Sequence, residues 1–600
     1  MAEPWMHRIA PQGTLAQAVE GVARHFNDRG YTFQDMSGAE RPYAFPQLEE
    51  ATRHRAYALQ SLGLRRGDRI GLVLTEPEDF ILTFLGAVRV GIVPIPLYPP
   101  VALGDLDGYM ERMARILASA EARALVVNES FKHLLWALVE RVDSLATLTY
   151  VEDLRGVVGE PSAVRVSRED ICFLQYTSGS TSDPKGVIVS HGSLEANVAG
   201  IMGEAGLGMD PERDRAVSWL PLYHDMGLIG FVLAPLYYGI PVWYIPTLRF
   251  LKHPNTWLDT VDRVRGSITF APPFALPLAA RRARDAELAR WDLSCLRQVG
   301  CGAEPISPEG VRAFVRTFAA CGLPETAVVP AYGMAEATLA ISLHPPGTAF
   351  VTRRVAAEVF EGQGVAQEAA PDAGRVLEHV ACGRTFPGHE VVAMDEAGQP
   401  LAPGREGELC FRGPSVSPGY FGHPEATQAT FRDGWLHTGD LGYILDGQVF
   451  VTGRLKDLII CNGRNYHPQS IEWPVAQIEG VRPGNVVAFS IPGETTEELV
   501  IALERKPDAP ADLRDRVEAC VRSSFGLNVR DLVLLQSGQL PKTSSGKLQR
   551  RKTRELYLSG KLVRSGSRIA GSRADKLTLA KHVAASTWSR LKNRTKKSST

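Results

Sequence analysis

The chain lacks the features that mark zinc proteins, secreted proteins and nucleic-acid binders. Its eight cysteines are scattered along 600 residues without a Cys-x-x-Cys pair, so we expect neither a zinc site nor a disulfide framework. Acidic and basic side chains nearly cancel to a net charge of −1, which gives no reason to expect a nucleic-acid partner. The first residues lack the charged and apolar segments of a secretory signal. These absences predict a cytoplasmic protein.

Long hydrophobic runs are also scarce. Residues 227–246 contain no charge and are about long enough to cross a bilayer. Three glycines and three prolines interrupt them, however, and Gly239, Ile240 and Pro241 have the composition of a turn between a helix and a buried strand. We therefore expect this segment in the protein core and not in a membrane.

The alternation of short apolar runs with amphipathic stretches indicates the fold class. Through about the first 450 residues this pattern predicts an α/β protein built of layers with parallel sheet. The expected strands are 70–74, 92–96, 124–127, 242–245 and 268–270, and the expected helices include 80–90 and 106–120. From residue 388 the pattern changes to short strands with Gly and Pro turns, which predicts a β-rich subdomain.

The domain organisation is expected to follow these changes in pattern. We predict an N-terminal domain over residues 1–455, with an insertion at about 349–374 where the pattern dissolves, and an α+β domain over 456–558. The remainder, 559–600, is a basic tail, with eleven Lys or Arg against a single acid between residues 561 and 600. It is either disordered or a short amphipathic helix, and in the latter form it could contact an acidic carrier protein or a membrane surface.

Residues 175–186 carry the most informative motif in the chain. Glycines free the backbone to turn N–H groups toward an anion, hydroxyls add donors and a lysine adds charge, so the loop predicts a polyphosphate site. It is not a Walker A loop, because its lysine precedes the glycine. A solvated loop is the alternative reading. The residues expected to contact phosphate are Thr177, Ser178, Gly179, Ser180, Thr181 and Lys185.

Four further segments carry potential chemistry. They are a His224–Asp225 pair between apolar residues, Tyr332-Gly333 with Glu336 nearby, Asp440 in a turn, and Lys547 in a second Gly/Ser loop. Taken singly, each has a plain structural reading: a core histidine, a packing tyrosine, a turn cap and a surface lysine.

In this order the segments resemble the acyl-adenylate-forming superfamily, which includes acyl-CoA synthetases, luciferases and nonribosomal adenylation domains. The resemblance covers residues from about 10 to 558. The fatty acyl-AMP ligase branch is the most similar, on residues 174–181, 220–228, 332–339 and 456–472 and on the position of the insertion. Ser182 and Ser470 depart from its motifs, at positions that should not touch the chemistry.

The resemblance implies a large layered α/β domain, a small mobile C-terminal domain, and the use of ATP with Mg²⁺. It places the phosphates on the 177–185 loop and Mg²⁺ on Glu336 and Thr181. Lys547 would bridge the acid and the α-phosphate, and Lys456 would be the hinge between the domains. The implied nucleotide contacts are Gly302, Ala303, Glu304, Tyr332 and Gly333 around adenine, Asp440 on the ribose, and Arg454 on ribose or phosphate.

The resemblance also implies the substrates. The acid is expected to be a fatty acid, since no cation lies near His224 in the sequence to read a polar head group. The side chains expected to line its tunnel are Phe231, Leu233, Leu236 and Tyr238. The acceptor would be the phosphopantetheine thiol of an acyl carrier protein, or of a polyketide or nonribosomal synthase carrier domain, acting in trans. A long-chain acyl-CoA synthetase and a catalytically silent adenylate-binding relative remain as alternatives.

Overall fold

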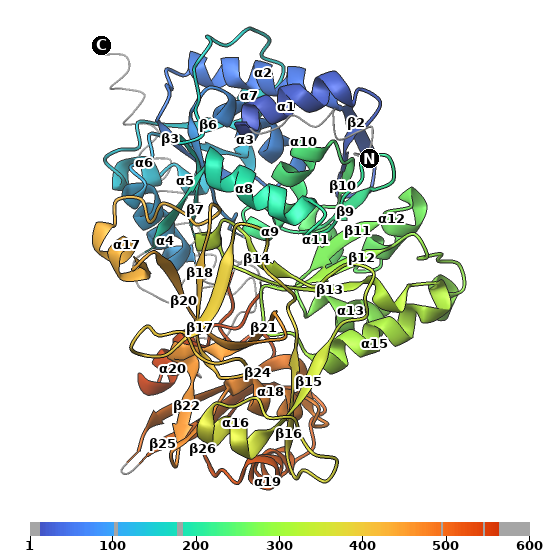
Figure 1. Cartoon of the computed structure of the whole chain (residues 1–600). Coiled ribbons are helices and arrows are strands. Elements are labelled where there is room, and N and C mark those ends of the chain that lie inside the picture. The colour runs from blue at the N-terminus through green and yellow to red at the C-terminus, as the bar shows by residue number, and fades with distance from the viewer. Residues whose placement is uncertain (1–12, 101–105, 177–183, 494–495, 544–545, 563–600) are drawn as a thin grey trace.

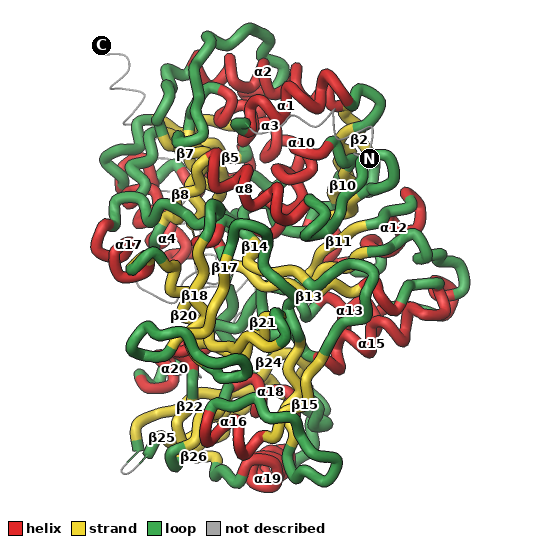
Figure 2. The backbone as a smooth tube through the Cα atoms, viewed as in Figure 1, coloured by secondary structure: helices red, strands yellow, loops and turns green. Residues whose placement is uncertain are grey.

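The structure is a computed structural model, and it describes residues 13–100, 106–176, 184–493, 496–543 and 546–562 (Figure 1). Figure 2 shows strands forming layers with helices on their outer faces, so the predicted α/β class is confirmed. Within the described part, no helix combines the length and the apolar character needed to span a membrane.

The largest sheet has eight strands, mostly parallel, with antiparallel pairs at both edges. Its order is β14 (Ala340–Leu343), β13 (Val328–Gly333), β12 (Gln298–Cys301), β11 (Ile268–Ala271), β9 (Ala216–Ser218), β10 (Val242–Tyr244), β1 (Gly30–Gln34) and β2 (Glu40–Ala44). The connecting helices include α1 (Leu15–His25), α8 (His191–Met202), α11 (Thr247–Lys252), α12 (Thr256–Val264), α13 (Ala275–Arg282) and α15 (Pro308–Phe318).

A second, four-stranded sheet is parallel throughout. Its order is β4 (Val93–Pro96), β3 (Arg69–Val73), β5 (Ala124–Val127) and β6 (Thr147–Tyr150), with α2 (Phe45–Ser61), α3 (Pro77–Arg89) and α4 (Leu106–Ser119) nearby. A hairpin of β7 (Ile171–Tyr176) and β8 (Gly186–Ser190) flanks the segment 177–183, which the sequence analysis expects to bind phosphate. The strands and helices expected in both sheets are found within a few residues of their predicted ends.

The uncharged segment 227–246 lies in the core, as expected. It forms α9 (Asp225–Leu228), a π-helical turn η4 (Ile229–Leu233) and α10 (Ala234–Tyr238) before strand β10. Gly239 ends α10 with φ 67°, a left-handed conformation that favours glycine. The turn between a helix and a buried strand is therefore confirmed.

The β-rich subdomain is an antiparallel sheet that carries residues of the site. Its strands are β17 (Glu390–Met394), β18 (Gly407–Arg412), β20 (Trp435–Leu445), β19 (Phe431–Arg432) and β21 (Gln448–Arg454), with α17 (Pro424–Thr430) before β19. The register pairs Asp440 of β20 with Arg454 of β21, which brings these two side chains to one place in the sheet.

The region of the expected insertion has regular structure of its own. Strand β15 (Thr352–Ala356) pairs with β16 (Val376–Val380), and α16 (Ala357–Gln363) lies between them in sequence. Figure 1 shows these elements at the bottom, beside the orange and red C-terminal elements. The Arg375 guanidinium lies 4.8 Å from the centre of the Phe525 ring. Nearby, Glu406, just before β18, is hydrogen-bonded to Nε2 of His467 at 2.9 Å.

The C-terminal part has cores of its own, formed by residues 459–562. Its elements are η8 (Leu455–Asp457), β22 (Ile459–Cys461), β23 (Arg464–Tyr466), α18 (Pro468–Ala476), β24 (Val481–Pro492), β25 (Glu497–Arg505), α19 (Leu513–Phe525), β26 (Val529–Leu535) and α20 (Arg550–Leu558). The predicted α+β character is confirmed, and Lys456 lies exposed in η8, where the chain enters this part.

Candidate active site

One large cavity of about 3650 Å³ lies where the three sheets of the N-terminal part meet the C-terminal part. The walls include candidate residues from every segment that the sequence analysis selected within the described ranges. These lining residues are Lys185, His224, Asp225, Gly302, Ala303, Glu304, Tyr332, Gly333, Glu336, Asp440, Arg454, Lys456 and Lys547. The expected phosphate contacts Thr177, Ser178, Gly179, Ser180 and Thr181 lie outside the described residues.

A polar group centred on the buried Asp440 forms one end of the cavity. The Tyr332 hydroxyl donates to Oδ2 of Asp440 at 2.9 Å, and Nε of Arg454 lies 2.9 Å from Oδ1. Burial raises the pKa of the Asp440 carboxyl, while the Arg454 guanidinium acts in the opposite direction. A carboxylate has about four lone-pair directions, so Asp440 can still accept hydrogen bonds from a ligand.

The segment after β12 forms a backbone ledge beside this group. A Cβ added at Gly302 would lie 2.6 Å from the Ala331 carbonyl oxygen, so only glycine allows this approach to β13. Ala303 adopts φ 73°, an uncommon conformation for a residue with a side chain. Burial raises the pKa of the adjacent Glu304. The ledge and the Tyr332 ring together offer a surface against which a planar ring of a ligand can lie.

Lys547 reaches this ledge from the C-terminal part. Its ammonium Nζ donates to the Ala303 carbonyl at 2.7 Å. The lysine sits in a tight turn, because Thr543 Oγ1 accepts its backbone N–H at 3.1 Å and Gly546 has φ 90°. Through this contact, the loop that carries Lys547 reaches the same cavity that Lys185 lines.

His224 and Asp225 are half-buried at the cavity wall, close enough to Lys547 for its charge to shift their pKa values. Burial, with a smaller effect of Lys547, lowers the pKa of His224 to about 3. Its Nε2 atom is buried without a hydrogen-bond partner among the described residues. Burial raises the pKa of Asp225, and Lys547 opposes that shift. His224 is therefore neutral and has one nitrogen free for a ligand.

A tyrosine that the sequence analysis missed connects Lys185 with Glu336. Tyr420 donates its hydroxyl to Oε1 of Glu336 at 2.8 Å, and the Lys185 ammonium lies 5.2 Å from the centre of its ring. Residues around Tyr420 pair with β8, and the Phe421 N–H donates to the Gly186 carbonyl at 2.8 Å. The only signal in the sequence is an aromatic residue in a Gly/Pro-rich turn, which does not reveal its partners.

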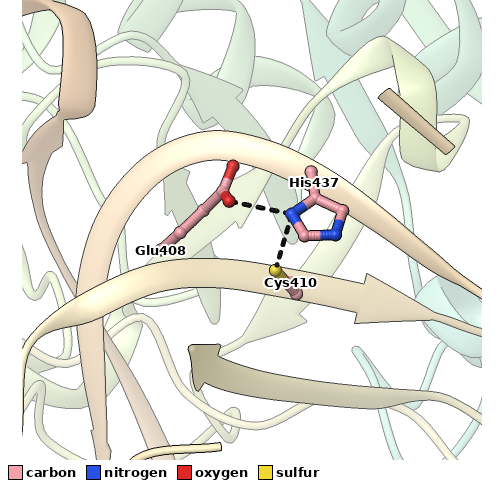
Figure 3. A group of neighbouring side chains, drawn as sticks. All are labelled: Glu408, Cys410 and His437. Atoms are coloured by element: carbon pink, nitrogen blue, oxygen red, sulfur yellow. Dashed lines mark hydrogen bonds and ion pairs between the residues drawn. The ribbon is translucent and has the colours of Figure 1, made fainter. Parts of the chain in front are cut away.

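Asp440 lies in strand β20 and not in the expected turn, and a second polar group fixes the strand at Gly439, just before it (Figure 3). Within the described residues, Glu408, Cys410 and His437 are the one group close enough to hold a metal ion. Hydrogen bonds already account for it: Nδ1 of His437 lies 2.8 Å from Glu408 Oε2 and 3.5 Å from Cys410 Sγ, and Glu408 Oε1 accepts the Gly439 N–H. Burial raises the pKa of the Cys410 thiol to about 12, which disfavours a metal-binding thiolate. We interpret the group as a support for Asp440.

The apolar part of the cavity differs from the expected tunnel. Phe231 lines it, but Leu233, Leu236 and Tyr238 do not, because the π-helical turn and α10 direct them into the surrounding core. The apolar walls come instead from several elements, since neighbouring strands of the large sheet all end at this cavity. They include Trp219, Tyr244, Phe270, Phe274 and Leu276.

The cavity can thus accommodate a nucleotide and an apolar acid side by side. Comparison with known proteins agrees with that reading. Residues 20–421 match the family described as AMP-binding enzyme. The chain is 36% identical to a putative acyl-CoA synthetase of Caulobacter vibrioides, over 92% of this chain and 96% of that relative. It is 31% identical to the medium-chain-fatty-acid–(acyl-carrier-protein) ligase JamA of Moorena producens, over 90% of this chain and 94% of that relative.

The comparison with solved structures also finds fatty acyl-adenylate ligases. A chain from a study of fatty acyl-adenylate ligases from E. coli and L. pneumophila has a TM-score of 0.86 and 34% identity, covering 92% of this chain and 98% of the other. An L. pneumophila fatty acyl-adenylate ligase in complex with acyl adenylate and pyrophosphate has a TM-score of 0.68 and 29% identity, covering 91% and 96%. Because the family match spans more than half of the sequence and close relatives span nearly all of it, this chain belongs to the AMP-binding enzyme family.

Proposed function

We propose that this protein is a fatty acyl-AMP ligase that activates a medium- or long-chain fatty acid with ATP and then passes the acyl group to a carrier protein. The observation that carries the proposal is the 2.7 Å hydrogen bond from Lys547 to the Ala303 carbonyl, inside a cavity with both a polar and an apolar part. A relative named long-chain-fatty-acid–AMP ligase FadD32, of Mycolicibacterium smegmatis, supports it at 31% identity.

The chemistry of adenylate formation explains why cationic side chains should gather where the acid meets the phosphates. A carboxylate is a poor electrophile because its charge is delocalised. In the first step a carboxylate oxygen attacks the α-phosphorus of ATP, the bond to the β-phosphate oxygen breaks, and pyrophosphate leaves. Negative charge from the acid and the phosphates then gathers in one place, so catalysis depends on cations and donors already positioned there. Lys547 and Lys185 are the lysines that we assign to this role.

The nucleotide contacts follow from the geometry of the cavity. Adenine would stack on the ring of Tyr332 beside Gly302, Ala303 and Glu304, with Gly333 allowing the close approach. The ribose hydroxyls would donate to Asp440, which Arg454 holds in place. The phosphates would lie on the loop of Thr177, Ser178, Gly179, Ser180 and Thr181 and on Lys185.

Glu336 fits the expected Mg²⁺. Its carboxyl group is buried at the cavity wall, and among the described residues Tyr420 is its one side-chain donor, so oxygen lone pairs remain for a hard cation. Glu336 with Thr181 would hold the ion, which neutralises phosphate charge when bound.

The fatty acid would lie along the apolar walls near Phe231 and Phe270. Burial contributes about 0.8 kcal/mol per CH₂ group, so a twelve-carbon tail gains on the order of 8–10 kcal/mol before ordering costs. His224 and Asp225 lie where the carboxylate would meet the α-phosphate. The neutral His224 can donate or accept there without adding charge.

The second step requires Lys547 to leave. We propose that the domain boundary lies at residues 455–456, that the C-terminal domain rotates at Lys456, and that the thiolate of a phosphopantetheine arm then attacks the acyl carbonyl and releases AMP. We propose that the carrier acts in trans. The name of the Moorena producens relative supports this acceptor. We place the reaction in the cytoplasm.

Free CoA is the alternative acceptor, and the name of the Caulobacter relative favours it. One experiment decides both points. ATP–pyrophosphate exchange is measured with C8 to C16 fatty acids, and preformed acyl-AMP is then offered CoA or a pantetheinylated carrier protein. We expect acid-dependent exchange and transfer to the carrier. No exchange with any acid would contradict the proposed activity, and transfer to CoA alone would establish an acyl-CoA synthetase.

A further inference from the structure

Exposed apolar side chains surround the place where the apolar part of the cavity reaches the surface. Met36, between β1 and β2, is 40% exposed, and Leu248 and Leu251 of α11 are 42% and 52% exposed. All three line the cavity. Nη1 of Arg249 donates to the Met36 carbonyl at 2.9 Å, which holds the turn against α11. We call Met36, Leu248 and Leu251 the apolar rim.

The apolar rim is continuous with the proposed acid-binding walls. Phe250 of α11 stacks on Trp219 with ring centroids 3.6 Å apart, and Phe274, just before α13, packs edge-on against the same indole at 6.4 Å. Trp219 and Phe274 line the cavity. An apolar path therefore leads from the surface to the segment that also carries His224.

Basic side chains flank the apolar rim. Lys252, Arg281 and Arg282 are exposed, and the first two line the cavity. None of the three forms an ion pair within the described ranges, whereas neighbouring Arg284 pairs with Glu287. Unpaired cations around an exposed apolar cluster favour an anionic, partly apolar partner.

Two acids, Asp35 and Glu76, also lie near the apolar rim, and neither belongs to α11 or α13. Asp35 is exposed, and its Oδ1 accepts the backbone N–H groups of Ser37, Gly38 and Ala39. Glu76 is half-buried at the cavity wall, and burial raises its pKa. The positive charge is therefore concentrated on the α11 and α13 side.

We propose that the apolar rim, with Lys252, Arg281 and Arg282, docks onto an anionic lipid bilayer and takes the fatty acid directly from it. The entry of the acid rests on the proposed function, whereas the docking does not. Apolar side chains beside basic ones suit the interface of an anionic membrane, where lipid tails cover the former and head groups pair with the latter. An acidic carrier protein would neutralise the cations but would gain nothing from an apolar opening into the cavity.

Vesicle co-sedimentation of the full chain tests the docking. The double variant Leu248→Glu/Leu251→Glu places two charges on the apolar rim, and Val158→Glu is the matched control, because Val158 is 73% exposed and does not line the cavity. The vesicles are phosphatidylcholine alone or a 1:1 mixture with phosphatidylglycerol. ATP–pyrophosphate exchange with soluble octanoate is measured for each protein as the check on folding.

We expect the wild type and Val158→Glu to bind the anionic vesicles equally and the double variant to bind at least tenfold more weakly. The wild type should bind neutral vesicles at least tenfold more weakly, and all three proteins should retain exchange at saturating octanoate, which shows that each is folded. Equal binding by the double variant would place the attachment elsewhere, for example on the basic tail, and would overturn the proposal. So would an absence of binding, or an unchanged binding with a raised KM for a carrier protein.

The two proposals fail separately. A loss of exchange in every protein, with the rim-dependent binding intact, would reject the ligase activity and leave the docking in place. Exchange without rim-dependent binding would reject the docking alone.

Discussion

The ribose end of the cavity and the Lys547 end are built in opposite ways. At the ribose end, Asp440 is buried with Tyr332 and Arg454 on its two oxygens, all from the N-terminal part. At the other end, Lys547 comes from the C-terminal part, and among the described residues a hydrogen bond to one backbone carbonyl holds its ammonium. The first end is a permanent binding surface. The second is a contact that one movement can break, which is what an enzyme with two successive half-reactions on one adenylate requires.

The largest effect should come from Lys547→Ala. We expect adenylate formation to fall about a thousandfold, since losing one preorganised charge contact costs about 3–4 kcal/mol of transition-state stabilisation. The affinity for ATP should change less than threefold, because the ribose end is intact. The measurement is acid-dependent pyrophosphate release, with exposed Lys561→Ala as the control. A thousandfold loss of ATP affinity instead would show that Lys547 also holds ATP before the reaction, and would contradict the proposed difference between the two ends.

The next largest effect should come from Asp440→Asn, at the permanent end. The amide keeps the shape but loses the charge that Arg454 faces, and hydrogen bonds to charged groups contribute about 1.5–3 kcal/mol. We expect the KM for ATP to rise about ten- to a hundredfold, with a smaller change in kcat. Asp446→Asn, in the exposed hairpin turn after β20, is the control and should leave both constants unchanged.

Lowering the pH should destabilise the fold, because the folded protein keeps His224 in its neutral form. Its pKa is lowered to about 3 in the fold and is about 6.5 in an unfolded chain, so between these values only the unfolded state binds the proton. Stability therefore falls as the pH falls below about 6.5, by at most about 1.4 kcal/mol per pH unit from this group. In His224→Gln the drop in Tm between pH 7 and pH 5 should be smaller, whereas exposed His253→Gln should melt as the wild type does.

The smallest effect should come from Tyr420→Phe, which removes the donor to Glu336 but keeps the ring near Lys185. Because the Tyr420 hydrogen bond lowers the pKa of the buried Glu336, its loss makes the carboxylate harder to ionise. We expect the Mg²⁺ concentration for half-maximal adenylation to rise about three- to tenfold, with unchanged kcat at saturating Mg²⁺. Tyr420→Ala should lower the rate further, because it also removes the ring.

The sequence predicted those features that depend on neighbouring residues in the chain. The Gly239 turn and the strands of the parallel sheets have signals within a few residues, and they were found close to their predicted positions. Tyr420 and the Glu408–His437 pair were missed, because these contacts join residues that are far apart in the sequence. Tyr420 and Glu336 are 84 residues apart, and Glu408 and His437 are 29 residues apart. The proposed acid-binding walls were predicted from a single helical segment, whereas the π-helical turn and α10 direct Leu233 and Leu236 into the core and other elements supply the surface.

The most direct test compares the two half-reactions in a single variant. Lys547→Ala is supplied first with ATP and fatty acid and then with synthetic acyl-AMP and a pantetheinylated carrier protein. If Lys547 serves only the first step from a position it later leaves, adenylate formation falls about a thousandfold while transfer from acyl-AMP stays within threefold of the wild-type rate. An equal loss in both steps would show that Lys547 does not leave, and would contradict the account.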